Sequence, residues 1–248
     1  MIIIKSNHEI QAMRKAGKIT AQCMQIVSEM IEQGISTKKL DEEAERFMRA
    51  NGATPSFKGY NGYPASICAS VNEEVVHGIP GPRKLSKGDI VGIDMGAYID
   101  GYHGDMARTF AVGDITPEAQ SLMDAAKDSF EAGLSNMTVG NRLGDVSHAI
   151  QQVIEKRGYS AVRALCGHGI GREMHEDPEV PNFGRRGRGV RLEHGMVLAV
   201  EPMVNIGTWE VNMLSDGWTV VTADDKLSAH YENTVVITEN GPEILTLV

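Results

Sequence analysis

Residues 93–105 constrain the fold more than any other segment, because they predict a β-hairpin that carries acidic side chains. Asp100-Gly101 stands between two apolar runs, and a two-residue turn of this kind has positive φ at both positions. With this turn, Asp94 faces Ala107 across the hairpin. Asp94 and Asp105 are then diagonal neighbours on one sheet face, roughly 7–8 Å apart at the backbone. Carboxylates at this spacing can reach two metal ions about 3.5–4 Å apart.

Three further candidate ligands, His168, Glu201 and Glu232, stand where strands or tight turns are expected to end or bend. Glu201 follows an apolar run, and Pro202 cannot continue the strand ladder. An acid there would be costly to bury without a cationic partner. Glu232 alone could equally be an outward-facing polar residue. Together with Asp94 and Asp105 these side chains form a ligand set suited to two divalent ions, whose charge four carboxylates neutralise.

His168 is flanked by glycines in Cys-Gly-His-Gly-Ile-Gly at 166–171, and glycine lets a backbone approach a site closely. A phosphate-binding loop is disfavoured here because no Lys-Ser/Thr ending follows. His77 and His175 are candidate donors to a substrate carbonyl. For His103 we expect a hydrogen-bonding structural role. The remaining histidines are expected to be structural or solvent-facing: His8, His148, His194 and His230.

The composition is that of an ordinary globular protein, with 42% hydrophobic and 23% charged residues among 248. A net charge of −9 argues against nucleic-acid binding as the main function. The arginine-rich run at 185–191 is interpreted as a solvated loop, with an anion-binding patch as the alternative. Three cysteines in no spaced pattern indicate a reducing compartment. No apolar stretch reaches 18 residues. We therefore expect a cytoplasmic protein with no membrane partner.

Helices are predicted from a capping box at 6–9 to about Gly34, over 37–51, over 117–134 and over 144–157. Strands are predicted over 65–71, 89–112 with its turn, 161–165, 196–204, 218–222 and 231–238. Segments 88–94 and 195–201 share a pattern of glycine, five mostly apolar residues and a carboxylate. This repeated pattern indicates two similar α/β halves that share a central sheet. No low-complexity linker divides the chain, so we expect one domain over residues 1–248.

Six segments of the sequence together resemble the methionine aminopeptidases, in the short bacterial type I form of the pita-bread metallopeptidases. They are Val-His-Gly-Ile-Pro at 76–80, Gly-Asp-Ile-Val-Gly-Ile-Asp at 88–94, Asp-Gly-Tyr-His-Gly-Asp at 100–105, Gly-His-Gly-Ile-Gly at 167–171, Glu-Pro at 201–202 and Ser-Ala-His-Tyr-Glu-Asn-Thr at 228–234. The resemblance implies an α/β (α+β) pita-bread fold, with two pseudo-symmetric halves and a central curved antiparallel sheet covered by helices. It also implies removal of N-terminal methionine, preferentially when the second residue is small.

The resemblance implies a role for each motif residue. Asp94 would chelate one divalent ion, Asp105 and Glu232 would bridge both, and His168 with Glu201 would complete the other. The identity of the ions stays open among Mn, Fe, Co and Zn. Glu201 would aid proton transfer during attack of water on the first peptide carbonyl, while His77 and His175 would contact the scissile amide.

The methionine side chain would occupy an apolar pocket, although core packing is the alternative for its lining residues. That pocket is expected to consist of Tyr60, Tyr63, Cys68 and Trp218, with Phe57 and Met174 as neighbours. At those last two positions a small thiol and an aromatic residue are common in the family, so the outline of the pocket is expected to differ. The partners would be nascent polypeptides and peptides with N-terminal methionine. Association with the ribosome would be compatible with this function, and no specific nucleic acid is expected as a partner. We expect a monomer.

Three alternative classes of protein share parts of this pattern. A proline-specific pita-bread peptidase shares the ligands but carries a substantial extra N-terminal domain. A non-catalytic pita-bread binding module would have lost the site, whereas all five ligands and both candidate donor histidines are present here. A non-haem iron oxygenase would require two histidines and one carboxylate, which four carboxylates fit poorly.

Overall fold

A computed structural model describes all residues, 1–248. Four α-helices occupy α1 (Asn7–Glu29), α2 (Thr37–Ala50), α3 (Pro117–Leu134) and α4 (Leu143–Lys156), and a 3₁₀ turn, η1, covers Tyr60–Gly62. The strands of the first half are β1 (Thr54–Pro55), β2 (Ile67–Val71), β3 (Glu74–Val76), β4 (Ile90–Ile99) and β5 (Tyr102–Ala111). Those of the second half are β6 (Ser160–Ala161), β7 (Cys166–Gly169), β8 (Glu176–Pro181), β9 (Val197–Val200), β10 (Met203–Asn205), β11 (Val211–Met213), β12 (Val220–Thr222), β13 (Ser228–His230), β14 (Asn233–Thr238) and β15 (Gly241–Ile244).

The first half is built on the β4–β5 hairpin, which has the predicted register. Asp94 pairs with Ala107, and the turn residues Asp100 and Gly101 have φ of 53° and 84°. Strands β1 and β2 extend the sheet on β4, and every pairing is antiparallel. Helix α1 packs on β4 and β5, and its buried face joins the larger apolar cluster of this half. The hairpin is therefore held rigidly from one side.

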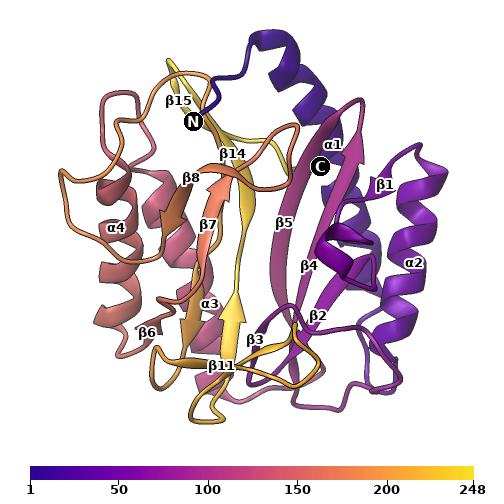
Figure 1. The fold of residues 1–248 in the computed structure, drawn as a ribbon. Helices are drawn as coiled ribbons and strands as arrows, with labels where there is room; N and C mark the ends of the chain where they lie inside the picture. Colours follow the sequence, from indigo (N-terminus) through magenta and orange to yellow (C-terminus); the bar gives the residue numbers. More distant parts are fainter.

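The second half repeats this plan with the antiparallel sheet β15-β14-β9-β7-β8. Helices α3 and α4 pack together, and an apolar cluster joins them to β9 and β14. Figure 1 shows α1 and α2 with the hairpin on one side of the molecule, and α3 and α4 with the second sheet on the other. The predicted pair of α/β halves is confirmed.

The two halves meet where β5 runs beside the start of β14 (Figure 1). Ala107 and Glu232 exchange backbone hydrogen bonds of 2.9 and 3.4 Å. The Thr234 hydroxyl accepts from Asp105 N and donates to Asp105 O, each at 2.9 Å. This seam brings a carboxylate oxygen of Asp105 within 4.8 Å of one of Glu232, although the two residues are far apart in the chain.

Several boundaries differ from the prediction. Helix α1 ends at Glu29 rather than near Gly34, because Gly34 turns with φ of 92° and donates its N–H to Leu85 O. The strand predicted over 196–204 is two strands, since Glu201-Pro202 interrupts the ladder. The strand predicted over 161–165 is reduced to β6, and β7 and β8 were not predicted. No helix is both long and apolar enough to cross a bilayer.

Candidate metal centre and substrate pocket

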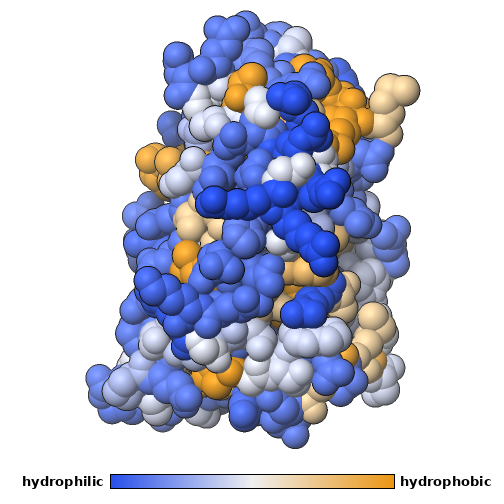
Figure 2. Space-filling model, turned by 90° about the vertical axis from the view of Figure 1, so that its left-hand side faces the viewer, coloured by the Kyte–Doolittle hydropathy of each residue, from blue (hydrophilic) through white to orange (hydrophobic).

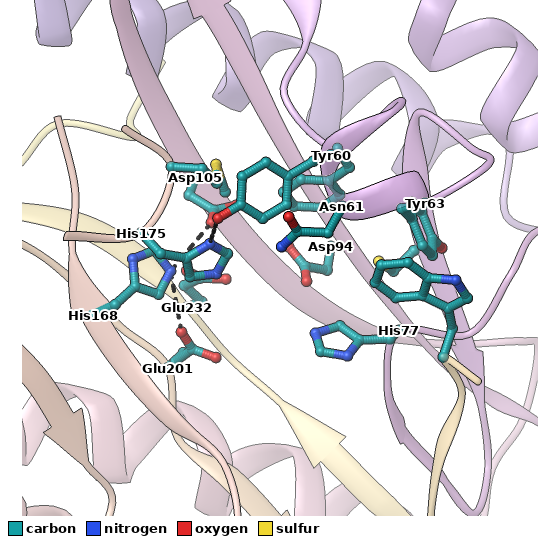
Figure 3. Close-up of a pocket in the computed structure, with 14 residues that line it drawn as sticks. Tyr60, Asn61, Tyr63, His77, Asp94, Asp105, His168, His175, Glu201 and Glu232 are labelled. Carbon is teal, nitrogen blue, oxygen red and sulfur yellow. Dashed lines mark hydrogen bonds and ion pairs between the residues drawn. The ribbon is translucent and has the colours of Figure 1, made fainter. Parts of the chain in front are cut away.

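Five side chains from five separate segments converge on one cavity at the seam (Figure 3). Asp94 comes from β4, Asp105 from β5 and His168 from β7, while Glu201 follows β9 and Glu232 lies between β13 and β14. His168 Nε2 is 3.8 Å from Asp105 Oδ2 and 3.6 Å from Glu201 Oε1. One nitrogen or oxygen each of Asp105, His168 and Glu232 lies within 4.8 Å of the others, a separation that a single ion can bridge.

The glycines around His168 are required by close approach of the neighbouring strands. A Cβ on Gly167 would stand 2.3 Å from Ala199 O of β9, and one on Gly169 would stand 2.1 Å from Asp177 O of β8. Both distances are far inside van der Waals contact with backbone atoms. The Gly-His-Gly pattern therefore lets β7 lie between two strands while its imidazole points into the cavity.

The environment of the four carboxylates disfavours their ionised form. Burial raises the pKa of Asp94 to about 7. Burial, and after it the neighbouring acids, raise the pKa values of Asp105, Glu201 and Glu232 well above their usual range. Such groups are stabilised when a cation replaces the missing water.

Several buried oxygens of this cluster have no hydrogen-bond partner within the protein: Asp94 Oδ1, Asp105 Oδ1 and Glu232 Oε1. Buried polar atoms in native proteins are normally satisfied, so unpartnered acceptors aimed at one cavity need a donor or a cation. These oxygens, together with an imidazole nitrogen, match the donor types of first-row divalent ions. The residues present therefore fit a divalent metal centre.

The imidazoles of the cavity are neutral at neutral pH. Burial lowers the pKa of His168 to about 3 and that of His77 to about 4, with His175 as the next cause in both. Burial also lowers the pKa of His175. The neutral His168 ring therefore forms no ion pair with Asp105 or Glu201. Its Nε2 faces these carboxylates as the nitrogen of a metal ligand would. His168 Nδ1 lies 2.8 Å from Gly169 O, so it carries the ring proton and leaves Nε2 free to bind a metal.

His175 and His77 reach the same cavity from different sides (Figure 3). The ring of His175 lies 4.2 Å from that of His168, and its Nδ1 is 2.7 Å from the Tyr60 hydroxyl. His77 follows β3 with a φ of 61°, an uncommon backbone conformation for a residue other than glycine. Such conformations cluster at functional sites, where surrounding structure holds them.

An apolar pocket adjoins the acidic cluster. Phe57, Tyr63, Cys68 and Met174 are buried together, and Trp218 packs against them. The rings of Tyr63 and Trp218 meet edge to face at 5.1 Å. The single proton of the Tyr63 hydroxyl is shared between the backbone oxygens of Ile67 and Gly78, which lie 3.1 and 3.0 Å away and fix the position of the ring.

All the residues predicted for the site line this one cavity, whose volume is about 200 Å³. The full lining is Phe57, Tyr60, Asn61, Tyr63, Cys68, His77, Asp94, Asp105, His168, Met174, His175, Glu201, Trp218 and Glu232. Only Asn61 was missed, and the Gly-Tyr-Asn-Gly turn around it was the available signal because Asn tolerates its φ of 49°. His103 does not line the cavity and contacts Ser56 Oγ at 2.8 Å, as expected for a structural residue. His230, expected to be structural or solvent-facing, is 3% exposed and lies beside the acids, so it is not solvent-facing.

A buried cluster of four carboxylates and one histidine between two α/β halves is the arrangement of a metal-dependent hydrolase. Comparison with known proteins identifies the family. Residues 11–239 match the family described as Metallopeptidase family M24, and the chain belongs to it. It is similar to a methionine aminopeptidase of Clostridium perfringens, with 58% identity over all of both chains. A crystal structure of the methionine aminopeptidase of Thermotoga maritima matches with a TM-score of 0.98 and 44% identity, again over all of both chains.

More distant proteins have the same fold. A prolidase from Pyrococcus furiosus matches with a TM-score of 0.82 at 24% identity, and this chain spans 66% of its length. That likeness concerns the fold alone. The predicted pita-bread fold, family and metallopeptidase class are confirmed.

Proposed function

We propose that this protein removes the N-terminal methionine from peptides and nascent polypeptides, preferentially when the second residue is small, with two divalent ions bound to its acidic cluster. One observation supports this above the others: the acidic cluster and an apolar pocket line the same cavity. An unbranched thioether suits a narrow apolar slot and makes favourable contact with aromatic rings such as Trp218 and Tyr63.

The ions would be held by Asp94, Asp105, His168, Glu201 and Glu232. Bound there, they would supply Lewis-acid polarisation of the peptide carbonyl and a water that ionises near neutral pH. Glu201 is the proton acceptor in this proposal, because its carboxylate is buried at the cavity wall and its pKa is raised by burial and by Asp94. The same residue would then pass the proton to the leaving amine.

His175 and His77 would donate to the scissile amide. The Tyr60 hydroxyl donates to His175 Nδ1 in this assignment, so the neutral ring carries its proton on Nε2. A neutral N–H donor facing the cavity can stabilise the negative charge that develops on the carbonyl oxygen. His77 supplies the corresponding contact from the opposite side.

A panel of tripeptides tests the substrate assignment, first varied only at position one and then only at position two. We expect methionine to exceed leucine in kcat/KM by about 10–200-fold, so that leucine is cleaved slowly, since the shape of an apolar pocket discriminates by about 1–3 kcal/mol. A small second residue should exceed a large one. Norleucine reports how Phe57 and Met174 shape the slot. Preference for an X-Pro bond would identify the proline-specific alternative, and equal kcat/KM for Met, Leu and Lys would refute the assignment.

The number and identity of the ions are tested separately. Metal analysis of the native protein, followed by chelation and restoration of activity with Mn, Fe, Co or Zn in turn, should give two ions per chain at full activity. Full turnover after chelation would exclude a metal-dependent reaction.

We further infer that residues 1–248 act as one catalytic domain, in the cytoplasm and as a monomer. The three cysteines are free, which suits a reducing compartment. On the face shown in Figure 2 hydrophilic side chains predominate and hydrophobic ones are scattered, so this face offers no broad apolar contact for a second copy. Light scattering tests the monomer, and co-sedimentation with ribosomes tests an association during synthesis.

A further inference from the structure

A second buried imidazole, His230, stands behind the acidic cluster. It is the last residue of β13, pairs with Met203 of β10 and is 3% exposed. Its Nε2 has no hydrogen-bond partner within the protein. The nearest carboxylate oxygens are Glu201 Oε2 at 3.7 Å and Glu232 Oε2 at 3.9 Å. An unpaired nitrogen in so polar a cluster calls for an acceptor, because buried polar groups are normally satisfied.

Glu201 lies between two imidazoles, with one oxygen toward each. Its Oε1 is 3.6 Å from His168 Nε2, and its Oε2 is 3.7 Å from His230 Nε2. The two rings differ in one respect: His168 lines the cavity, whereas His230 does not. His230 therefore approaches the carboxylates from outside the cavity lining, and one ligand atom each of Asp94, His230 and Glu232 lies within 4.8 Å of the others. This is the place of a residue that orients a ligand.

We propose that His230 is a positioning residue of the metal centre, whose Nε2–H donates a hydrogen bond to Glu201 Oε2 when the cluster is loaded. The proposal rests on the metal centre of the proposed function. The bond would fix the Glu201 carboxylate with Oε1 turned to the ion, on the side where His168 Nε2 lies. Partners of this kind behind a ligand typically change metal affinity by 10–100-fold.

Three substitutions of His230 test whether it acts as a hydrogen-bond donor or only fills space. His230→Gln keeps an N–H at a similar reach, His230→Asn keeps the amide on a shorter stem, and His230→Leu removes the donor but keeps apolar volume. His148→Leu is the matched control, because that half-buried imidazole lies on α4 and makes one long contact, 3.3 Å to Gly184 O. Circular dichroism and thermal melting of the chelated proteins establish that each variant is folded.

Calorimetric titration of the metal-free proteins with Co²⁺ is the primary readout, and the kcat and KM of the loaded enzymes are the second. We expect His230→Leu and His230→Asn to weaken Co²⁺ binding about 10–100-fold and to lower kcat with little change in KM. His230→Gln should restore affinity to within a few-fold of wild type, and the control should match wild type. If His230→Leu does not fold, the Co²⁺ affinities of His230→Gln and His230→Asn are compared, and their difference tests the proposal.

Two results would overturn the proposal. Wild-type Co²⁺ affinity in His230→Leu, or in His230→Asn where the Leu variant does not fold, would make His230 a structural filler. Equal weakening in a folded His230→Gln would show that the imidazole itself is required, as for a direct ligand. Failure of the proposed function would look different, because the wild-type protein would then bind no divalent ion in the same titration.

Discussion

The ion pair between Lys5 and Glu176 ties the start of the chain to the strand that follows His175. Lys5 Nζ lies 2.5 Å from Glu176 Oε2 and also donates to Ile3 O at 3.1 Å. The two side chains are only 3% and 4% exposed. The backbone N–H of Lys5 donates to Gly195 O at 2.8 Å, which secures the segment further. This is a buried pair in which neither charge has water as an alternative partner.

Replacing Lys5 by methionine should reduce the free energy of unfolding by about 3–5 kcal/mol, because it leaves the Glu176 carboxylate buried without its counter-ion. For a chain of this length such a loss lowers the melting temperature by about 6–20 °C. The control is Lys15→Met, since Lys15 pairs with Asp100 at 2.6 Å but both side chains are more than half exposed. An exposed pair of this kind contributes about 0–1 kcal/mol.

Urea unfolding of the metal-free proteins at pH 7 measures both variants. The double substitution Lys5→Leu with Glu176→Leu should recover most of the loss, because an apolar pair often replaces a buried ion pair at little cost. If Lys5→Met loses no more than Lys15→Met, burial does not govern the strength of this pair and the reasoning is refuted. A double variant as unstable as Lys5→Met would mean that packing, rather than the unpaired charge, causes the loss.

Three further predictions concern the site. Glu201→Gln should lower kcat by about 10²–10⁴-fold with a smaller effect on KM, since proton transfer acts in the transition state; near-normal turnover in a metal-loaded variant would exclude that role. His175→Ala should lower kcat by about 10²–10³-fold and leave metal content unchanged, whereas loss of metal would make it a ligand. Metal affinity should fall by about tenfold for each pH unit below 7 from Asp94 alone, because its pKa is raised to about 7 and the ion must displace its proton. Titration with Mn²⁺ between pH 8 and 6 measures this, and a flat profile would contradict it.

The parts of the fold that the sequence predicts well are those set by local chemistry. The register of β4 with β5 follows from the two-residue turn at Asp100-Gly101, so the relation of Asp94 to Asp105 is predictable from neighbours alone. The start of α1 follows likewise from the capping box of Ser6 and Glu9. In both cases every interaction that fixes the structure lies within a few residues.

Elements that depend on partners elsewhere in the chain are harder to predict. Strand β7 contains Gly167 and Gly169, residues that disfavour strands by propensity. It pairs with both β8 and β9, which lie so close that neither position has room for a Cβ. The end of α1 at Glu29 reflects a bond from Gly34 to Leu85, which no local pattern reveals. Tertiary context overrides local preference at these points.

His230 shows where a signal was present but ambiguous. It lies two positions before Glu232, and side chains two positions apart in a strand share a face, so the alternation places an imidazole beside a predicted ligand. The ladder breaks between β13 and β14, which made that inference unsafe from sequence alone. What fixes His230 against Glu201 is the pairing of β13 with β10, the strand that begins just after Glu201-Pro202. The break after β9 removes Glu201 from the sheet ladder, and β10 begins directly after it. Because β13 pairs with β10, His230 lies beside Glu201. The position of the imidazole is therefore set by the strand topology and by no sequence motif.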